Sequence, residues 1–172
     1  MRITLAELEH HRVNVSESYG PGSLDYHGAE FRQAAPLNVN ASAELLGAEI
    51  RIKGHLGTRL EASCDRCLGA VEIPVDCDFD LFYRPMQTIA REEEMEVPEE
   101  EMEIGFYSGD GIEVADVVTE QVILAVPMKV VCNPDCKGLC PVCGANRNVA
   151  QCDCAPSQRD SPFASLQGDG GD

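Results

Sequence analysis

The chain has 172 residues, 44% of them apolar and 25% charged, which fits one globular domain with at most a small appendage. It carries 13 basic and 30 acidic residues, a formal net charge of −17, and such a surface repels phosphate backbones. The composition therefore disfavours extensive direct binding of nucleic acid. It favours a basic protein partner, or else serves solubility alone.

No targeting signal stands out along the chain. The opening residues, MRITLAELEHH, carry acids early and contain no apolar run of signal-peptide length. No segment approaches 18 consecutive apolar residues. We therefore expect a cytoplasmic protein without membrane contact, in which thiols stay reduced.

Residues 1–127 predict a β-rich body. A short strand is possible over residues 2–8, followed by a turn at SYGPGSLD. The stretches AEIRIKG and TRLEASC each alternate apolar and polar residues. The same alternation runs through VEIPVDCDFDLFY, residues 71–83, and is typical of a half-buried antiparallel strand. Pro74 has no N–H to donate, which predicts an edge strand or a bulge there.

The second half of the chain changes character twice. Residues 87–103 contain REEEMEVPEEEME, which predicts a solvated acidic loop, either a plain linker or a docking strip for a basic partner. Apolar residues then recur at helical spacing, predicting the main helix over about 115–126, bounded by Pro127 and covering one face of the sheet. A cysteine-rich segment follows at 128–156, and the composition of 157–172 predicts a mostly flexible tail.

The first cysteine pair, Cys64 and Cys67, lies between two predicted strands in SCDRCLGAV. We expect a hairpin whose turn is a metal knuckle, because two thiolates two residues apart can converge on one ion. Two thiolates alone bind zinc weakly, so closure of a tetrahedral site needs two more ligands from elsewhere.

Six further cysteines crowd into the cysteine-rich segment. The fragment 140–154 could supply four ligands by itself, which leaves two thiols to complete the site begun by the first pair. Since all four histidines lie far from this segment in sequence, we expect all-sulfur structural sites for one or two ions, with zinc favoured and iron open. Cys77 falls on the apolar face of the long strand and is expected in the core. The expected metal ligands are Cys64, Cys67, Cys132, Cys136, Cys140, Cys143, Cys152 and Cys154.

Rival interpretations of the cysteines are weaker. CDRC could be a thioredoxin-like redox pair, but that motif belongs in a βαβ context and strands flank it here. The spacing Cys136-x-x-x-Cys140-x-x-Cys143 matches the iron–sulfur motif of radical S-adenosylmethionine enzymes, which need a barrel larger than this chain. A disulfide scaffold does not suit a reduced compartment.

Three stretches in order, ASCDRCLGAVEIPV, VTEQVILAVPM and CNPDCKGLCPVCGANRN followed by CDC, resemble the YceD-like family of large ribosomal RNA subunit accumulation proteins. The resemblance runs from about residue 20 to residue 166, and its motifs fall on the eight cysteines named above. It implies a cytoplasmic, bacterial-type protein needed for normal accumulation of large-subunit ribosomal RNA. Members are not established enzymes, and their genes tend to neighbour that of a small basic ribosomal protein. The family's DPRF-like ending appears here as DSPF.

Together these features predict an α+β fold. We expect a mostly antiparallel sheet or a partly open β-barrel, with one main helix and a C-terminal cysteine-rich zinc-binding tail. The expected function is that of a non-enzymatic ribosome biogenesis factor that contacts a basic ribosomal or assembly protein and touches ribosomal RNA indirectly or weakly. The alternatives are a thiol redox or metal-dependent enzyme acting in RNA metabolism, and an interaction module unrelated to ribosomes.

Overall fold

The computed structural model describes residues 1–86 and 104–154. The predicted acidic loop 87–103 and flexible tail 157–172 lie outside these residues. The described elements, in chain order, are β1 (Arg2–Thr4), α1 (Leu5–Leu8), β2 (Val13–Tyr19), β3 (Phe31–Gln33), β4 (Leu37–Leu46), β5 (Glu49–Ser63), β6 (Ala70–Pro85), β7 (Ile104–Tyr107), β8 (Gly111–Glu113) and α2 (Val114–Ala125).

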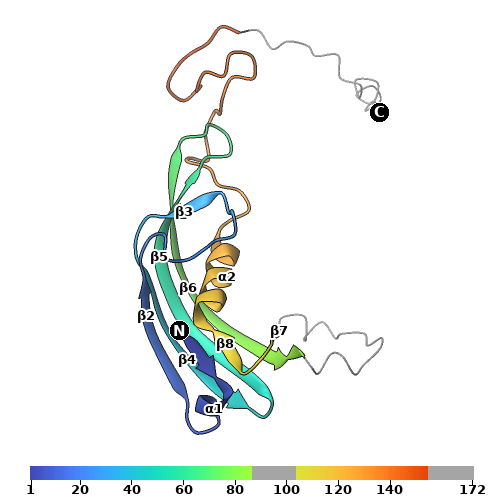
Figure 1. Ribbon diagram of the computed structural model, residues 1–172. Helices are drawn as coiled ribbons and strands as arrows, with labels where there is room; N and C mark the ends of the chain where they lie inside the picture. Colours follow the sequence, from blue (N-terminus) through green and yellow to red (C-terminus); the bar gives the residue numbers. More distant parts are fainter. Residues whose placement is uncertain (87–103, 155–172) are drawn as a thin grey trace, which may run out of the picture.

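The main sheet has the strand order β2-β4-β5-β6-β7, with β3 pairing on β5 (Figure 1). Its centre is the long hairpin of β5 and β6, paired continuously from Ile50↔Tyr83 to Ser63↔Ala70. The two stretches AEIRIKG and TRLEASC, predicted as separate strands, belong to the single strand β5. The pairs within the sheet are antiparallel, except that β7 runs parallel to β6.

The alternative prediction of a partly open barrel is wrong, because the sheet is open. Its end strands are β2 and β7, and within the described residues they do not pair with each other. Among the described residues, strand β7 pairs only with Phe82–Pro85, at the end of β6, so it does not close the sheet onto β2. Strands β1 and β8 pair with each other in a separate two-stranded sheet.

Two local predictions about the strands have clear outcomes. The strand expected over residues 2–8 ends at Thr4, because Thr4 caps helix α1: its hydroxyl accepts the Glu7 N–H, and the Glu7 carboxylate accepts the Thr4 N–H at 3.0 Å. Pro74 pairs with Arg59 in unbroken register on a part of β6 that has one neighbouring strand among the described residues. It is therefore an edge position and not a bulge.

Helix α2 covers the inner face of the sheet, as predicted, and lies within one residue of the expected bounds (Figure 1). Its buried residues recur at helical spacing and join the main core with the inward side chains of β4, β5 and β6. Within the described part of the chain, no helix is long and apolar enough to cross a membrane. The fully buried core side chains include Ile3, Leu37, Ile50, Leu56, Leu60, Val39, Val118 and Val122.

The inner face of β5 also contains a close approach between strands. Gly54 pairs with Ala41 of β4, and an added Cβ at Gly54 would lie 2.5 Å from the Ala41 Cβ. Glycine is therefore the residue that lets β4 and β5 pack at this position.

Candidate metal centres

The first candidate centre begins at the turn between β5 and β6. Cys64 donates its N–H to the Gly69 carbonyl at 2.8 Å, and the Leu68 N–H donates to the Cys64 carbonyl at 2.9 Å. Leu68 adopts the left-handed conformation, with φ of 59°. This tight loop buries both thiols, as Cys64 is 0% exposed and Cys67 is 7% exposed. The predicted hairpin turn between two strands is thus confirmed, and that it holds a metal stays a prediction.

The C-terminal segment returns to this loop and is held there by hydrogen bonds. Asp65 and Val130 exchange two of them: the Asp65 N–H donates to the Val130 carbonyl at 2.8 Å, and the Val130 N–H donates to the Asp65 carboxylate at 2.7 Å. Arg66 donates to the carbonyls of Pro134 and Cys136, each at 3.0 Å. These contacts place the segment's first two cysteines over the hairpin turn.

Four sulfur atoms meet as a result, those of Cys64, Cys67, Cys132 and Cys136, all within 4.8 Å of one another. The Cys64 and Cys136 sulfurs are 3.9 Å apart, and those of Cys67 and Cys132 are 3.6 Å apart. Zinc–sulfur bonds of about 2.3 Å in a tetrahedron require sulfurs about 3.8 Å apart. The spacing fits a tetrathiolate zinc site.

The second group comprises Cys140, Cys143, Cys152 and Cys154, also within 4.8 Å of one another. Its turn repeats the first: the Gly144 N–H donates to the Cys140 carbonyl at 2.9 Å, and Gly144 is left-handed with a φ of 72°, just as Leu68 in the hairpin is left-handed with a φ of 59°. Neither group contains a histidine or a carboxylate among the described residues. Both donor sets are of the soft kind that selects zinc or iron.

The thiols in each group have opposed pKa shifts. A hydrogen bond from the Cys132 N–H lowers the pKa of Cys64 to about 6, and the N–H groups of Cys143 and Val142 lower that of Cys140 to about 6. Hydrogen bonding with Cys136 raises the pKa of Cys132 to about 12. Without a cation the four sulfurs of a group cannot all ionise, whereas a bound metal would stabilise four thiolates.

An asparagine that the sequence analysis passed over lies beside the first group. The Asn148 side chain donates to the Cys136 sulfur at 3.2 Å and accepts the Lys137 N–H at 2.8 Å. Outer partners of this kind orient metal ligands and tune their basicity. Asn148 is the last residue of the motif GANRN, but the sequence alone does not show that its side chain contacts a cysteine twelve residues earlier.

All eight predicted ligands are therefore brought together, in the partition that their spacing suggested. Their binding of a metal stays a prediction. Cys77 belongs to neither group and lies half-buried on β6 against the main core. All nine cysteines are free thiols in the structure, and the CDRC pair sits in a hairpin turn rather than at the start of a helix.

A family model described as "Large ribosomal RNA subunit accumulation protein YceD" matches residues 52–168. "Large ribosomal RNA subunit accumulation protein YCED homolog 1, chloroplastic" from Zea mays is 27% identical over 158 residues, which cover 78% of this chain and 53% of the relative. The protein of the same name from Arabidopsis thaliana is 21% identical over 166 residues, which cover 80% of this chain and 49% of the relative. An uncharacterized protein of Mycobacterium tuberculosis is 29% identical over 113 residues, covering 65% and 52%. The chain spans about half the length of these curated relatives, and no solved structure gives a significant match.

Proposed function

The chain belongs to the YceD family of large ribosomal RNA subunit accumulation proteins, and on that premise we propose that it is a non-enzymatic factor in ribosome biogenesis. In this role it supports accumulation of the large-subunit ribosomal RNA, and it acts in the cytoplasm. The observation that carries the proposal is the extent of the family match, since residues 52–168 include all eight clustered cysteines and helix α2.

We further propose that each cysteine group holds one structural zinc ion. Four thiolates would fill the coordination sphere of zinc and leave no position for a substrate. The first ion would join the C-terminal segment to the β5–β6 hairpin, and the second would shape the segment itself. This supports a structural role rather than a catalytic one.

The proposed partner is a basic ribosomal or assembly protein. The net charge of −17 supports this, and two zinc ions held by eight thiolates would add further negative charge. Phosphate backbones are repelled by such a field, so ribosomal RNA would be reached indirectly or weakly. Capture of a basic ribosomal protein that is lost at rising salt supports the proposal, and salt-sensitive capture of naked RNA contradicts it.

One observation favours a second candidate, a thiol redox enzyme acting in RNA metabolism. The pKa of Cys64 is lowered to about 6, as in a reactive thiol. However, Cys64 is 0% exposed, so a substrate disulfide has no access to it. The structural role therefore remains the better supported one.

Deletion of the gene followed by sucrose-gradient analysis of ribosomes tests the function. We expect the deletion to lower mature large-subunit RNA relative to small-subunit RNA. The wild-type gene should restore it, while Cys64→Ser/Cys67→Ser and a chain ending before Cys132 should not. An unchanged RNA ratio in the deletion contradicts the function, and full rescue by both variants contradicts the role of the metal.

A further inference from the structure

Helix α2 and strands β6 and β7 meet at the end of the sheet away from the cysteine-rich segment (Figure 1). A groove lies between them. It consists of two adjoining cavities of about 420 Å³ and 470 Å³ that share Tyr83 and Glu120. One wall is helix α2, and the other is formed by β6, β7 and β8.

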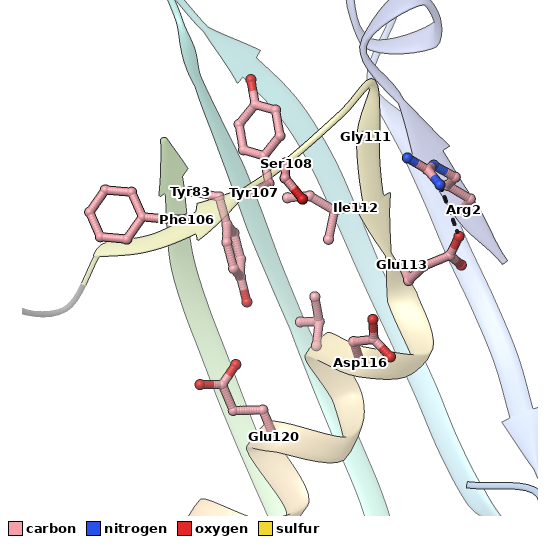
Figure 2. A pocket seen from close by; sticks show the side chains of 11 residues that line it. Arg2, Tyr83, Phe106, Tyr107, Ser108, Gly111, Ile112, Glu113, Asp116 and Glu120 are labelled. Carbon is pink, nitrogen blue, oxygen red and sulfur yellow. Dashed lines mark ion pairs between the residues drawn. The ribbon is translucent and has the colours of Figure 1, made fainter. Parts of the chain in front are cut away.

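Carboxylates dominate the helix side of the groove. Glu113, Asp116 and Glu120 line it. Arg2 lies beside them and forms an ion pair with Glu113 at 3.7 Å (Figure 2). It also pairs with Asp110 at 2.5 Å. Within the described residues, Asp116 and Glu120 make no ion pair. The groove thus presents two exposed carboxylates on successive turns of one helix, neither of them paired with a cation of the described residues.

A buried phenol provides an independent sign of a ligand. Tyr83 is 8% exposed, its hydroxyl points toward helix α2 near Glu120 (Figure 2), and it makes no hydrogen bond within the described part of the chain. Burial, with a smaller effect of the Glu120 carboxylate, raises the pKa of Tyr83 to about 12, so the phenol stays neutral. The ring lies against Gly105, where an added Cβ would be 2.5 Å from it, so glycine leaves the space that the ring occupies. The ring is buried, whereas the hydroxyl oxygen is not among the fully enclosed unpartnered atoms of the described residues, so it opens on the groove and can bond a ligand.

The groove also offers apolar surface beside its charges. The Phe106 side chain on β7 is 45% exposed and Leu124 on α2 is 69% exposed. Lysine and arginine combine an apolar stem with a cationic head, so their side chains match a groove of this composition. Aromatic rings beside carboxylates additionally favour a cation over a neutral group.

We propose that this groove binds a lysine- and arginine-rich segment of a protein partner, with one cationic side chain seated between Tyr83, Asp116 and Glu120. The partner class is that of the proposed function, on which this inference rests for its biological meaning. Charge argues against the other occupants: RNA, a second copy of this acidic chain and the chain's own acidic run at 87–103 would all place like charges together.

Fluorescence anisotropy with a labelled peptide tests the proposal on the full, metal-loaded chain. The probe is four repeats of Arg-Ala-Leu; the comparison probes are four repeats of Glu-Ala-Leu and an oligouridine of equal length. We expect the basic peptide alone to bind, with affinity falling between about 50 mM and 300 mM salt as screening increases. Asp116→Lys/Glu120→Lys should weaken its binding at least tenfold. Glu30→Lys/Glu72→Lys, which makes the same change in net charge at two other exposed positions, should leave the Kd within about twofold.

Tyr83→Phe removes only the hydroxyl and should lower the affinity for the peptide roughly tenfold, which is the effect of losing one hydrogen bond to a charged group. The proposal is overturned if Asp116→Lys/Glu120→Lys and Glu30→Lys/Glu72→Lys lose peptide affinity to the same degree. Binding of the oligouridine in place of the peptide also overturns it. If the purified chain does not bind the peptide, but deletion of the gene still lowers large-subunit RNA, the groove proposal alone is overturned. An unchanged RNA ratio together with peptide binding overturns the proposed function and leaves the groove intact.

Discussion

The sulfur atoms of Cys64 and Cys136 lie 3.9 Å apart, although 72 positions separate the two residues in sequence. This contact ties the C-terminal segment to the longest hairpin of the sheet. Little else of an apolar kind holds it there, since the small core at this point consists of Cys64, Cys67 and Cys136 with Val71, Val131 and Leu139 beside them. A core of this size cannot offset the entropy of ordering the segment, so a metal is the natural source of the remaining stability.

The two cysteine groups should respond differently to loss of a ligand. Cys136→Ser should remove one ion and free the whole segment from the hairpin, exposing the Leu139 amide, which donates to the Arg66 carbonyl at 2.9 Å. Cys143→Ser should also remove one ion but leave that amide protected. Metal analysis with hydrogen exchange measures both effects. Equal loss of Leu139 protection in the two variants would show that the groups are not separable.

The side chain of Asn148 should set the affinity of the first centre. Asn148→Ala removes the donor to the Cys136 sulfur, and outer-shell changes of this kind weaken metal binding by about 10- to 100-fold. Competition with a chromophoric chelator gives the affinity. Asn133→Ala is the matched control, because Asn133 accepts the Asp135 N–H without contacting a sulfur. A control variant that loses affinity to the same degree would assign the effect to the loop backbone.

Packing on the inner face of the sheet depends on Gly54. Gly54→Ala places a methyl group against Ala41 and should lower the free energy of unfolding by about 1–3 kcal/mol, as over-packing does. Gly57→Ala is the control: the nearest atom to its added Cβ is 3.7 Å away, an ordinary contact. Urea unfolding compares the two. Equal stabilities would mean that β4 and β5 can separate at this point without cost.

The stability of the fold should fall at high pH partly through Tyr83. Its folded pKa of about 12 lies above the ordinary value of 10.0, so the folded chain holds this proton more tightly than the unfolded chain. The resulting stability is complete below pH 10 and is lost as the pH rises through about 12. Urea unfolding across this window should show a steeper decline for wild type than for Tyr83→Phe. Parallel curves would rule out the contribution of this residue.

The sequence was informative where patterns are local. Strict alternation over residues 71–83 marked β6, apolar residues at helical spacing marked α2, and the CxxC pair between strands marked the turn. The partition of the cysteines followed from spacing, since the fragment 140–154 contains four of them and leaves two for the hairpin. These features depend on residues near one another in the chain.

Other features depended on distant partners. Strand β4, LNVNASAELL, buries Leu37, Val39 and Ala43, but its asparagine and alanine content has low β-propensity and hid the alternation. The parallel strand β7 has four residues and no local signal of its direction. The groove likewise joins Tyr83 of β6 to Glu120 of α2, a proximity that exists only after the helix has packed on the sheet.

The metal content of the purified, reduced chain tests the central claim most directly, if it is measured together with protection of the Leu139 amide. We expect two zinc ions for each intact chain, none for a chain ending before Cys132, and loss of Leu139 protection when a chelator strips the intact chain. A chain that carries no metal and still protects this amide would contradict the account.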